Sequence, residues 1–316
     1  MKNSLVSVII PTFNRFECLF KAIESAINQT YPNIEIIVID DNFENPELRK
    51  RINKVITLKY PKVRYLMPDA HLGGSFARNE GIKVATGEYI AFLDDDDEFL
   101  PSKVEEQLKV FKTARTERLA MVYCYGNVIY PNGTIEIENT DIVGCPIDTQ
   151  MYFNIAGTSF WLIRRDVLVE IGGFDKIYCH QDGIVILKLL AKMYTLDIVR
   201  KPLVNYYAHN HDAGVTTVSM QSINADKEYF EICKKHFPVL TKKQQKMVMY
   251  NTYRSIILDE YRINEKKLAK QDYKRALQTN MGIKNKLKLA CFWICKQVVL
   301  HNTLKKDQKY MENTNG

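Results

Sequence analysis

One stretch of this chain constrains its fold more than any other: an apolar run that ends in a block of acid. Residues 89–93 read Tyr-Ile-Ala-Phe-Leu, and four aspartates, Asp94 to Asp97, follow directly. An apolar run without alternation is typical of a strand buried on both faces of a parallel sheet. In open α/β sheets the ligand crevice lies outside the carboxyl ends of the strands. The sequence therefore predicts that these aspartates line a site.

The four carboxylates repel one another, and beside a buried strand this repulsion raises their pKa values unless a positive charge intervenes. Strand periodicity places Asp94 and Asp96 on one side and Asp95 and Asp97 on the other. A divalent cation would supply the charge, because oxygen ligands suit Mg²⁺ or Mn²⁺ and a small ligand set leaves positions open for substrate phosphates. The alternative for an isolated acidic run is a solvated turn.

Before this block, apolar segments alternate with segments of helical spacing, and the links are short. Strands are expected over residues 5–10, 34–39 and 63–66, each followed by a helix, with Asn14, Asn45 and Ser75 as the N-caps. This alternation predicts right-handed βαβ units and a doubly wound α/β sheet. After the aspartates we expect a hairpin, a strand, a helix and a last strand, over residues 119–137, 157–163, 181–193 and 203–207.

Length, charge and cysteine content limit the class of protein. A chain of 316 residues is long for one domain, so we expect a large domain with an appendage. The net charge is +7, but a nucleic-acid-binding function predicts aromatics interleaved with a basic groove, whereas the best-defined cleft is acidic. The start of the chain lacks the pattern of a signal peptide, and the seven scattered cysteines are typical of reduced thiols. Both features favour the cytoplasm.

Several motifs, taken in order, resemble those of family 2 glycosyltransferases. They are Ser7 to Arg15, Ile39 to Asn42, Ala77 to Gly81, Gly87 to Asp97, Gly172 to Asp175, and Gln181-Asp182. The resemblance implies a GT-A fold, in which a Rossmann-like, doubly wound and mostly parallel sheet carries the site, and inverting transfer from a nucleotide-diphosphate sugar. It implies a catalytic domain over residues 1–220, with a nucleotide-sugar half at 1–115 and an acceptor half at 116–220. A basic helical extension would follow over residues 221–316.

The resemblance also assigns residues to the donor nucleotide. By position in the motifs, the nucleotide pocket falls to Pro11, Thr12 and Asn14, and the base or its ribose falls to Asp41. Arg78 would lie near the diphosphate, with pairing to Glu80 or another surface acid as the alternative.

The remaining assignments concern the metal and the base. Asp94, Asp95 and Asp96 correspond to the family's DxD motif, in which Asp96 would ligate Mn²⁺ or Mg²⁺ and Asp94 would face the nucleotide sugar. His209 is a further candidate metal ligand, because some GT-A enzymes use a late histidine. Asp182 would be the general base; its alternative role is that of an acidic residue favoured at a helix N-terminus. Gln181 stands where many members have glutamate.

The C-terminal part shows long helical patterns rich in Lys and Tyr, over residues 222–237, 241–263 and 265–278. The segment 283–300 is too short and too charged to span a bilayer. It suits an interfacial amphipathic helix and peripheral membrane contact, or else a helix packed on the catalytic domain with its lysines in water.

The sequence thus predicts a metal-dependent inverting glycosyltransferase of the hexosyl- or N-acetylhexosaminyltransferase class. A UDP-sugar is the expected donor, and a saccharide or lipid-linked saccharide is the expected acceptor. The resemblance and the basic tail imply a setting in surface polysaccharide biosynthesis, such as capsule or lipopolysaccharide, at the cytoplasmic membrane face. The alternative is a catalytically silent nucleotide-sugar-binding subunit that partners an active transferase. No residue identifies the sugar or sets the oligomeric state.

Overall fold

The computed structural model describes residues 4–208 and 218–295. Within them the chain forms a nine-stranded sheet in the order β3-β2-β1-β4-β8-β6-β9-β5, with β7 paired to β6. The first four strands of this order run parallel to one another: β3 (Arg64–Leu66), β2 (Ile34–Asp40), β1 (Val6–Thr12) and β4 (Tyr89–Phe92). Their carboxyl ends therefore share one edge of the sheet, as the sequence predicted.

The second half of the sheet is mixed. Strand β8 (Leu162–Arg164) runs antiparallel to both of its neighbours, β4 and β6 (Leu119–Ile129). Strand β9 (Thr195–Tyr207) is parallel to β6. Two short strands complete the sheet: β5 (Glu98–Phe99), antiparallel to β9, and β7 (Ile135–Glu138), which forms the predicted hairpin with β6.

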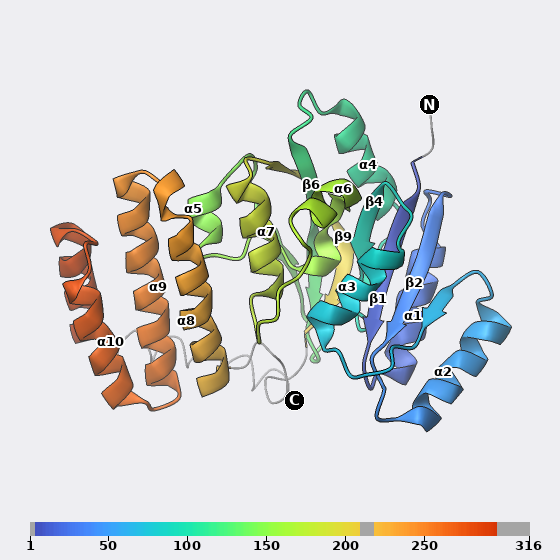
Figure 1. Cartoon of the computed structure of the whole chain (residues 1–316), viewed down its shortest axis with the longest axis horizontal. Helices are drawn as coiled ribbons and strands as arrows, with labels where there is room; N and C mark the ends of the chain where they lie inside the picture. The colour runs from blue at the N-terminus through green and yellow to red at the C-terminus, as the bar shows by residue number, and fades with distance from the viewer. Residues whose placement is uncertain (1–3, 209–217, 296–316) are drawn as a thin grey trace.

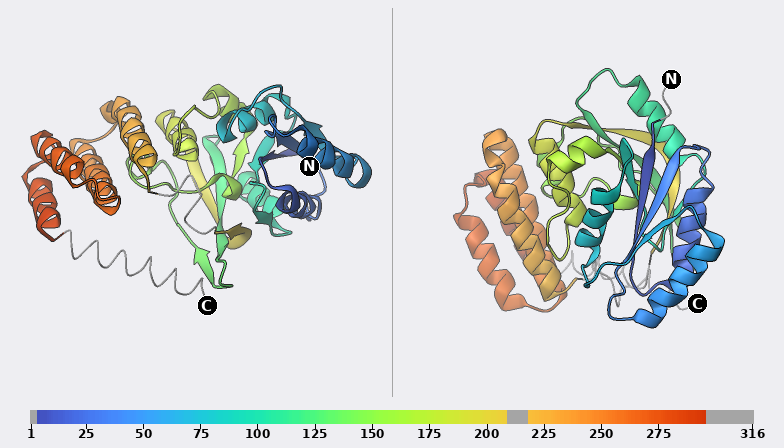
Figure 2. Two further views of the ribbon diagram at one scale, coloured as in Figure 1. Left: turned by 90° about the horizontal axis from the view of Figure 1, so that it is seen from below. Right: turned by 45° about the vertical axis from the view of Figure 1, so that its right-hand side comes forward.

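Helices cover both faces of the sheet (Figure 2). One face carries α1 (Phe16–Ile27), α2 (Pro46–Lys59) and α4 (Lys103–Thr113). The other carries α3 (Gly74–Val84), α6 (Arg165–Glu170) and α7 (Gln181–Ala191). Two shorter elements, α5 (Ile147–Gln150) and the 3₁₀ helix η1 (Thr158–Phe160), lie in the segment between β7 and β8.

The strands β1, β2 and β4 fill the centre of the core, where Ile9, Ile37 and Phe92 are completely buried. Burial of one such side chain contributes about 2 kcal/mol. Helix α3 lies so close to β1 that a Cβ added at Gly81 would come within 2.4 Å of the Ile9 side chain. The glycine of the Ala77 to Gly81 motif is therefore a packing requirement.

The C-terminal extension consists of α8 (Met220–Lys235), α9 (Lys242–Arg262), α10 (Lys266–Gln278) and a further helical segment at residues 283–295. Helix α8 stands beside α7, and α9 and α10 follow in turn, further from the sheet (Figure 1). Side chains of α8 and Val248 of α9 join the main core. Ile257 of α9 forms a second apolar cluster with side chains of α10 and of the last segment. The three predicted helices of this region are confirmed, with ends within a few residues of those expected.

Some local predictions are wrong. Asn14 does not cap α1, since it lies in the left-handed region with φ 58° and its N–H donates to Asn42 Oδ1. Ser75 does not cap α3, whose N-cap is Gly73. The strand expected over residues 157–163 is a 3₁₀ turn followed by β8, and the strand expected over residues 203–207 begins at Thr195.

Candidate active site

The polar segments singled out in the sequence meet at the carboxyl edge of the parallel strands. Strand β4 ends at Phe92, and the four aspartates form the turn after it, closed by a hydrogen bond from Asp97 N–H to the Asp94 carbonyl. The neighbouring strand β1 ends at Thr12 and delivers the loop that begins at Phe13. Burial alternates along the turn as predicted: Asp95 and Asp97 are buried, and Asp94 and Asp96 are partly exposed.

Asp95 ties the β1 loop to the β4 turn. Its Oδ2 accepts hydrogen bonds from the Thr12 hydroxyl at 2.7 Å and from Phe13 N–H at 3.2 Å, and its Oδ1 lies 2.9 Å from the Arg15 guanidinium. Arg15 also pairs with Asp96 at 2.7 Å. Asp95 thus holds the end of β1 and the loop after it, where the predicted nucleotide-pocket residues Thr12 and Asn14 lie. Pro11, also assigned to that pocket, directly precedes Thr12 inside β1.

Arg78 connects α3 to the aspartates. Its guanidinium lies 2.5 Å from Asp94 Oδ1, and a second nitrogen lies 3.4 Å from Gln181 Oε1. Glu80, the alternative partner, pairs instead with Lys83 at 2.6 Å. Arg78 therefore lies between the turn of four aspartates and the N-terminus of α7, which carries Asp182.

The other two aspartates face the second half of the sheet. Asp97 accepts hydrogen bonds from the Ser159 hydroxyl at 2.6 Å and from Tyr207 N–H at 3.3 Å, which fixes the end of β9 beside the turn. Asp96 lines a cavity of about 240 Å³ together with Lys21 and Tyr207. The cavity places open volume directly against the candidate metal ligand.

Charge accumulates in this turn. Burial raises the pKa of Asp95 to about 6, and burial followed by repulsion from Asp94 raises the pKa of Asp97 well above its ordinary value. Burial alone would lower the pKa of Arg15, but attraction to Asp96 and Asp95 outweighs it and raises that pKa. The carboxylate oxygens of this turn fit a hard divalent cation, because Asp96 lines the cavity and Asp94 supplies a second carboxylate in the same turn.

Asp41, after β2, organises the loop that leads into α3. Its carboxylate accepts hydrogen bonds from Leu72 N–H at 2.6 Å and Gly73 N–H at 2.8 Å, and lies 3.0 Å from the His71 ring. His71 in turn contacts the ring of Phe13, with 4.9 Å between centroids. Phe13, Asp41 and His71 therefore meet beside the β1 loop, where the nucleotide pocket was predicted.

Asp182 lies in the first turn of α7. Its Oδ1 accepts a hydrogen bond from Gly183 N–H at 2.8 Å, which is the local contact expected of an acidic residue at a helix N-terminus. Its Oδ2 accepts a hydrogen bond from Asn154 Nδ2 at 2.7 Å, a contact that comes from a different part of the chain. Asn154 also lines a cavity of about 320 Å³ with Tyr123, Gly157 and other residues between positions 123 and 206.

The structure adds residues that the sequence did not single out, namely His71, Asn154 and Ser159. Each acts across a long sequence separation: Asn154 lies 28 residues from Asp182, and Ser159 lies 62 residues from Asp97. No local motif identifies such residues, because their partners are distant in the sequence and become neighbours only in the folded chain. His209, a candidate metal ligand, lies outside the described residues.

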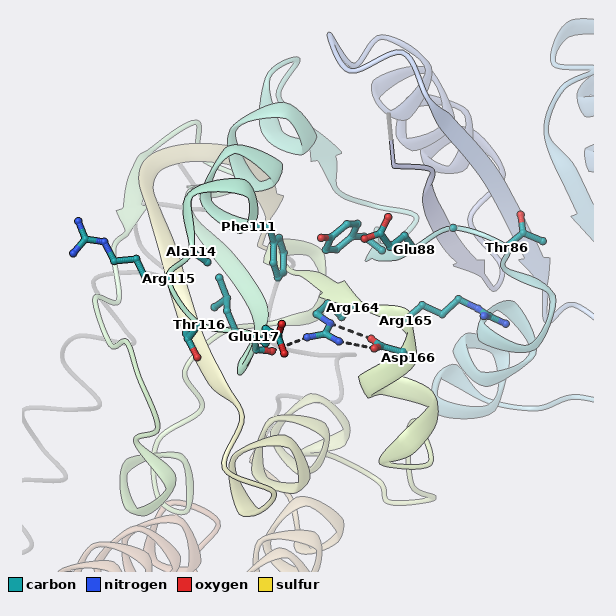
Figure 3. A pocket seen from close by; sticks show the side chains of 13 residues that line it. Thr86, Glu88, Phe111, Ala114, Arg115, Thr116, Glu117, Arg164, Arg165 and Asp166 are labelled. Carbon is teal, nitrogen blue, oxygen red and sulfur yellow. Dashed lines mark hydrogen bonds and ion pairs between the residues drawn. The ribbon is translucent and has the colours of Figure 1, made fainter. Parts of the chain in front are cut away.

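A larger cavity of about 720 Å³ lies at the other edge of the sheet (Figure 3). It is lined at the beginning of β4 by Glu88 and Tyr89 and at the end of β8 by Arg164. Arg164 points toward Asp166 and pairs with it at 2.5 Å. Because the aspartate turn follows the opposite end of β4, this cavity is separate from the candidate active site.

The known proteins that this chain resembles are glycosyltransferases. Residues 7–172 match the sequence profile of glycosyl transferase family 2. The amylovoran biosynthesis glycosyltransferase AmsB of Erwinia amylovora is 26% identical over 215 residues, which cover 66% of this chain and 71% of AmsB. WcaA of Escherichia coli K12, a glycosyl transferase whose name assigns it to colanic acid biosynthesis, is 35% identical over 128 residues, or 40% of this chain and 44% of WcaA.

The fold has counterparts among solved structures. The mannosyltransferase PcManGT from Pyrobaculum calidifontis, solved in complex with GDP-Man and Mn²⁺, superposes with a TM-score of 0.57 at 16% identity. The match covers 99% of this chain and 86% of that one. The GT-A fold predicted from the sequence is thereby confirmed. Among the described residues, no helix is both long and apolar enough to cross a membrane.

Proposed function

The chain belongs to glycosyl transferase family 2, and on that premise we propose that it transfers a sugar, with inversion, from a nucleotide-diphosphate donor to a saccharide or lipid-linked saccharide. The relatives named for amylovoran and colanic acid biosynthesis support a role in making a surface polysaccharide. We propose a UDP-sugar as the donor. The nucleotide half at residues 1–115, the acceptor half at 116–220 and the helical extension remain our proposed division of the chain.

One observation carries the proposal: Arg78 connects the turn that holds the candidate metal ligand to the start of the helix that holds the candidate base. It pairs with Asp94 of the candidate metal turn and reaches Gln181, the residue before Asp182. Inversion by a single displacement requires a base on one side of the anomeric carbon and stabilisation of the leaving diphosphate on the other. We assign the second role to the turn after β4 and the first to Asp182 of α7, so that no covalent nucleophile is needed.

The proposed roles on the donor side follow the geometry of the β1 and β2 ends. Thr12, Asn14 and Asp41 would bind the nucleotide, and Asp95 would act indirectly, since its carboxylate holds Thr12 and Arg15. Arg78 lies in the first turns of α3, so its charge and the helix N-terminus both favour a diphosphate.

A divalent cation bound at Asp96, with Asp94 toward the sugar, would neutralise charge on the leaving diphosphate. Mn²⁺ or Mg²⁺ suits these oxygens, and the PcManGT structure was solved in complex with both GDP-Man and Mn²⁺. On the acceptor side, Asp182 would take the proton of the attacking hydroxyl as its oxygen bonds to the anomeric carbon. The bond from that carbon to the diphosphate oxygen breaks at the same time, and its electron pair leaves with the nucleotide.

The metal proposal is tested by transfer measured in excess chelator, with Mn²⁺ or Mg²⁺ added back. Chelation should abolish transfer and the added ion should restore it, whereas Asp96→Ala should resist that restoration. Full transfer in excess chelator would refute metal dependence. Binding of nucleotide sugars without any transfer would instead indicate the silent binding subunit.

Residues 283–295 bear on the proposed membrane contact. Leu289 and Phe292 are buried in the second apolar cluster, so one face of this helical segment packs on the extension. A different face leaves Ile283, Leu287 and Ile294 exposed by 79%, 62% and 77%. The segment contains no acidic residue and three lysines: Lys284, Lys286 and Lys288. Exposed apolar side chains among lysines suit the surface of an anionic membrane, and we propose peripheral contact there.

A further inference from the structure

Helix α7, which carries Asp182, begins in an uncommon way. Its N-cap is His180, in the left-handed region with φ 63° and ψ 21°, and the His180 side chain makes no cap hydrogen bond. A non-glycine residue in this region is strained by roughly 1 kcal/mol and persists only when its surroundings fix it. The surroundings that fix His180 come from the C-terminal extension.

Two residues one turn apart on α8 hold the His180 ring. Asp226 Oδ1 lies 2.5 Å from His180 Nε2. The Tyr229 ring stacks on the imidazole, with 4.6 Å between centroids and 10° between planes. Figure 1 shows α8 beside α7. The start of the catalytic helix is therefore anchored to the first helix of the extension.

Tyr229 of α8 also begins a chain of hydrogen bonds that reaches Asp182. The buried Tyr229 hydroxyl donates to the Gln150 carbonyl at 2.8 Å. Gln150, itself 1% exposed, places its side-chain nitrogen 3.3 Å from the Gly183 carbonyl and 3.3 Å from Asn154 Oδ1. Asn154 then donates its own Nδ2 hydrogen to Asp182 Oδ2 at 2.7 Å.

These contacts determine the orientation of Asp182. Its first-turn contact with Gly183 is local and would form in any such helix, whereas the bond from Asn154 selects how the carboxylate turns. Asn154 is exposed and borders the 320 Å³ cavity, so by itself it could rotate freely. Gln150 restricts that rotation, and Gln150 is in turn held by Tyr229.

We propose that Asn154 and Gln150 are positioning residues for Asp182, and that Tyr229 and the His180–Asp226 pair make the C-terminal extension part of the catalytic apparatus. This inference rests on the proposed role of Asp182 as the base. It assigns α8 a function in the reaction, beyond packing on the catalytic domain.

The test uses the full-length protein and measures transfer, donor KM and melting temperature for Asn154→Ala and Tyr229→Phe. Asn154→Ala removes the bond to Asp182 together with the bond from Gln150. Tyr229→Phe removes the hydroxyl that bonds to Gln150 and retains the ring that stacks on His180. These losses should lower kcat by roughly three- to tenfold for Tyr229→Phe and about tenfold for Asn154→Ala, with donor KM unchanged. Tyr273→Phe is the matched control, since Tyr273 lies in the second apolar cluster of the extension, and it should transfer like the wild type.

A double-mutant cycle separates the outcomes. If Asn154 acts through the Asp182 carboxylate, Asn154→Ala should cost little further transfer in an Asp182→Asn background, because the group that it positions is gone. Equal losses in both backgrounds, or wild-type kcat in Tyr229→Phe and Asn154→Ala, would overturn the positioning role while leaving Asp182 as the base. Near wild-type transfer by Asp182→Asn alone would refute the proposed base itself.

Discussion

Replacing Asp182 by asparagine tests the proposed chemistry most directly, because it preserves size and removes basicity. In the wild type both carboxylate oxygens accept hydrogen bonds, from Gly183 N–H and from Asn154 Nδ2. Asparagine offers one acceptor oxygen, so at most one of these bonds is lost, a structural effect of about 1 kcal/mol. Loss of a positioned base lowers transfer by roughly 10²- to 10⁴-fold, which is about 3 to 5 kcal/mol of barrier. The catalytic effect should therefore exceed the structural one.

Single-turnover transfer, calorimetric donor affinity and thermal unfolding on the same variant distinguish the two roles of Asp182. A base predicts a large fall in transfer with donor affinity and stability almost unchanged. A helix-terminal role predicts reduced stability and weaker donor binding alongside any loss of rate. Asp166→Asn is the matched control, since Asp166 lies in the first turn of α6 and accepts a hydrogen bond from Val167 N–H at the same 2.8 Å. Near wild-type transfer by Asp182→Asn would contradict the assignment.

Two further predictions concern stability and the membrane. Burial lowers the pKa of Lys103 to about 8, so the unfolded chain binds this proton more tightly and stability should rise with pH. Between about pH 7 and pH 10 the free energy of unfolding of the wild type should rise by roughly 2 to 3 kcal/mol because of this group. Lys103→Met should lose this rise, and the exposed control Lys109→Met should keep it. Urea unfolding measures the effect, and equal pH slopes for all three proteins would refute it. Replacing Ile283, Leu287 and Ile294 together by serine should reduce sedimentation with anionic vesicles without lowering transfer to a soluble acceptor; unchanged sedimentation would exclude this face as the contact.

The helices of the extension show how far local pattern reaches. Their periodicity predicted the ends of α8, α9 and α10 to within a few residues. The apolar spacing of a helix and its polar end residues are local features of a contiguous stretch of sequence. The cap predictions failed at Asn14 and Ser75 for the opposite reason. Asn14 is held by Asn42 from another strand end, and a cap depends on backbone angles that such contacts set.

Strand β9 shows that residue types alone do not predict where a strand begins. The strand expected over residues 203–207 begins directly after Pro202, and proline cannot donate to a ladder. In the structure β9 runs through it, because the β6–β9 register shifts beside Tyr125, the partner of Pro202. An irregularity that accommodates a proline depends on the neighbouring strand, which sequence pattern alone does not specify.

The sequence by itself determined the alternation of strands and helices, the block of aspartates at the end of β4, and membership of a glycosyltransferase family, because these are encoded in short contiguous stretches. The fold decided which group each carboxylate meets: Arg15 for Asp95, Arg78 for Asp94, Ser159 for Asp97 and Asn154 for Asp182. All four partners come from other elements, between 16 and 80 residues away. Hydrogen bonds act over about 3 Å, so only the packing of those elements could bring the partners together.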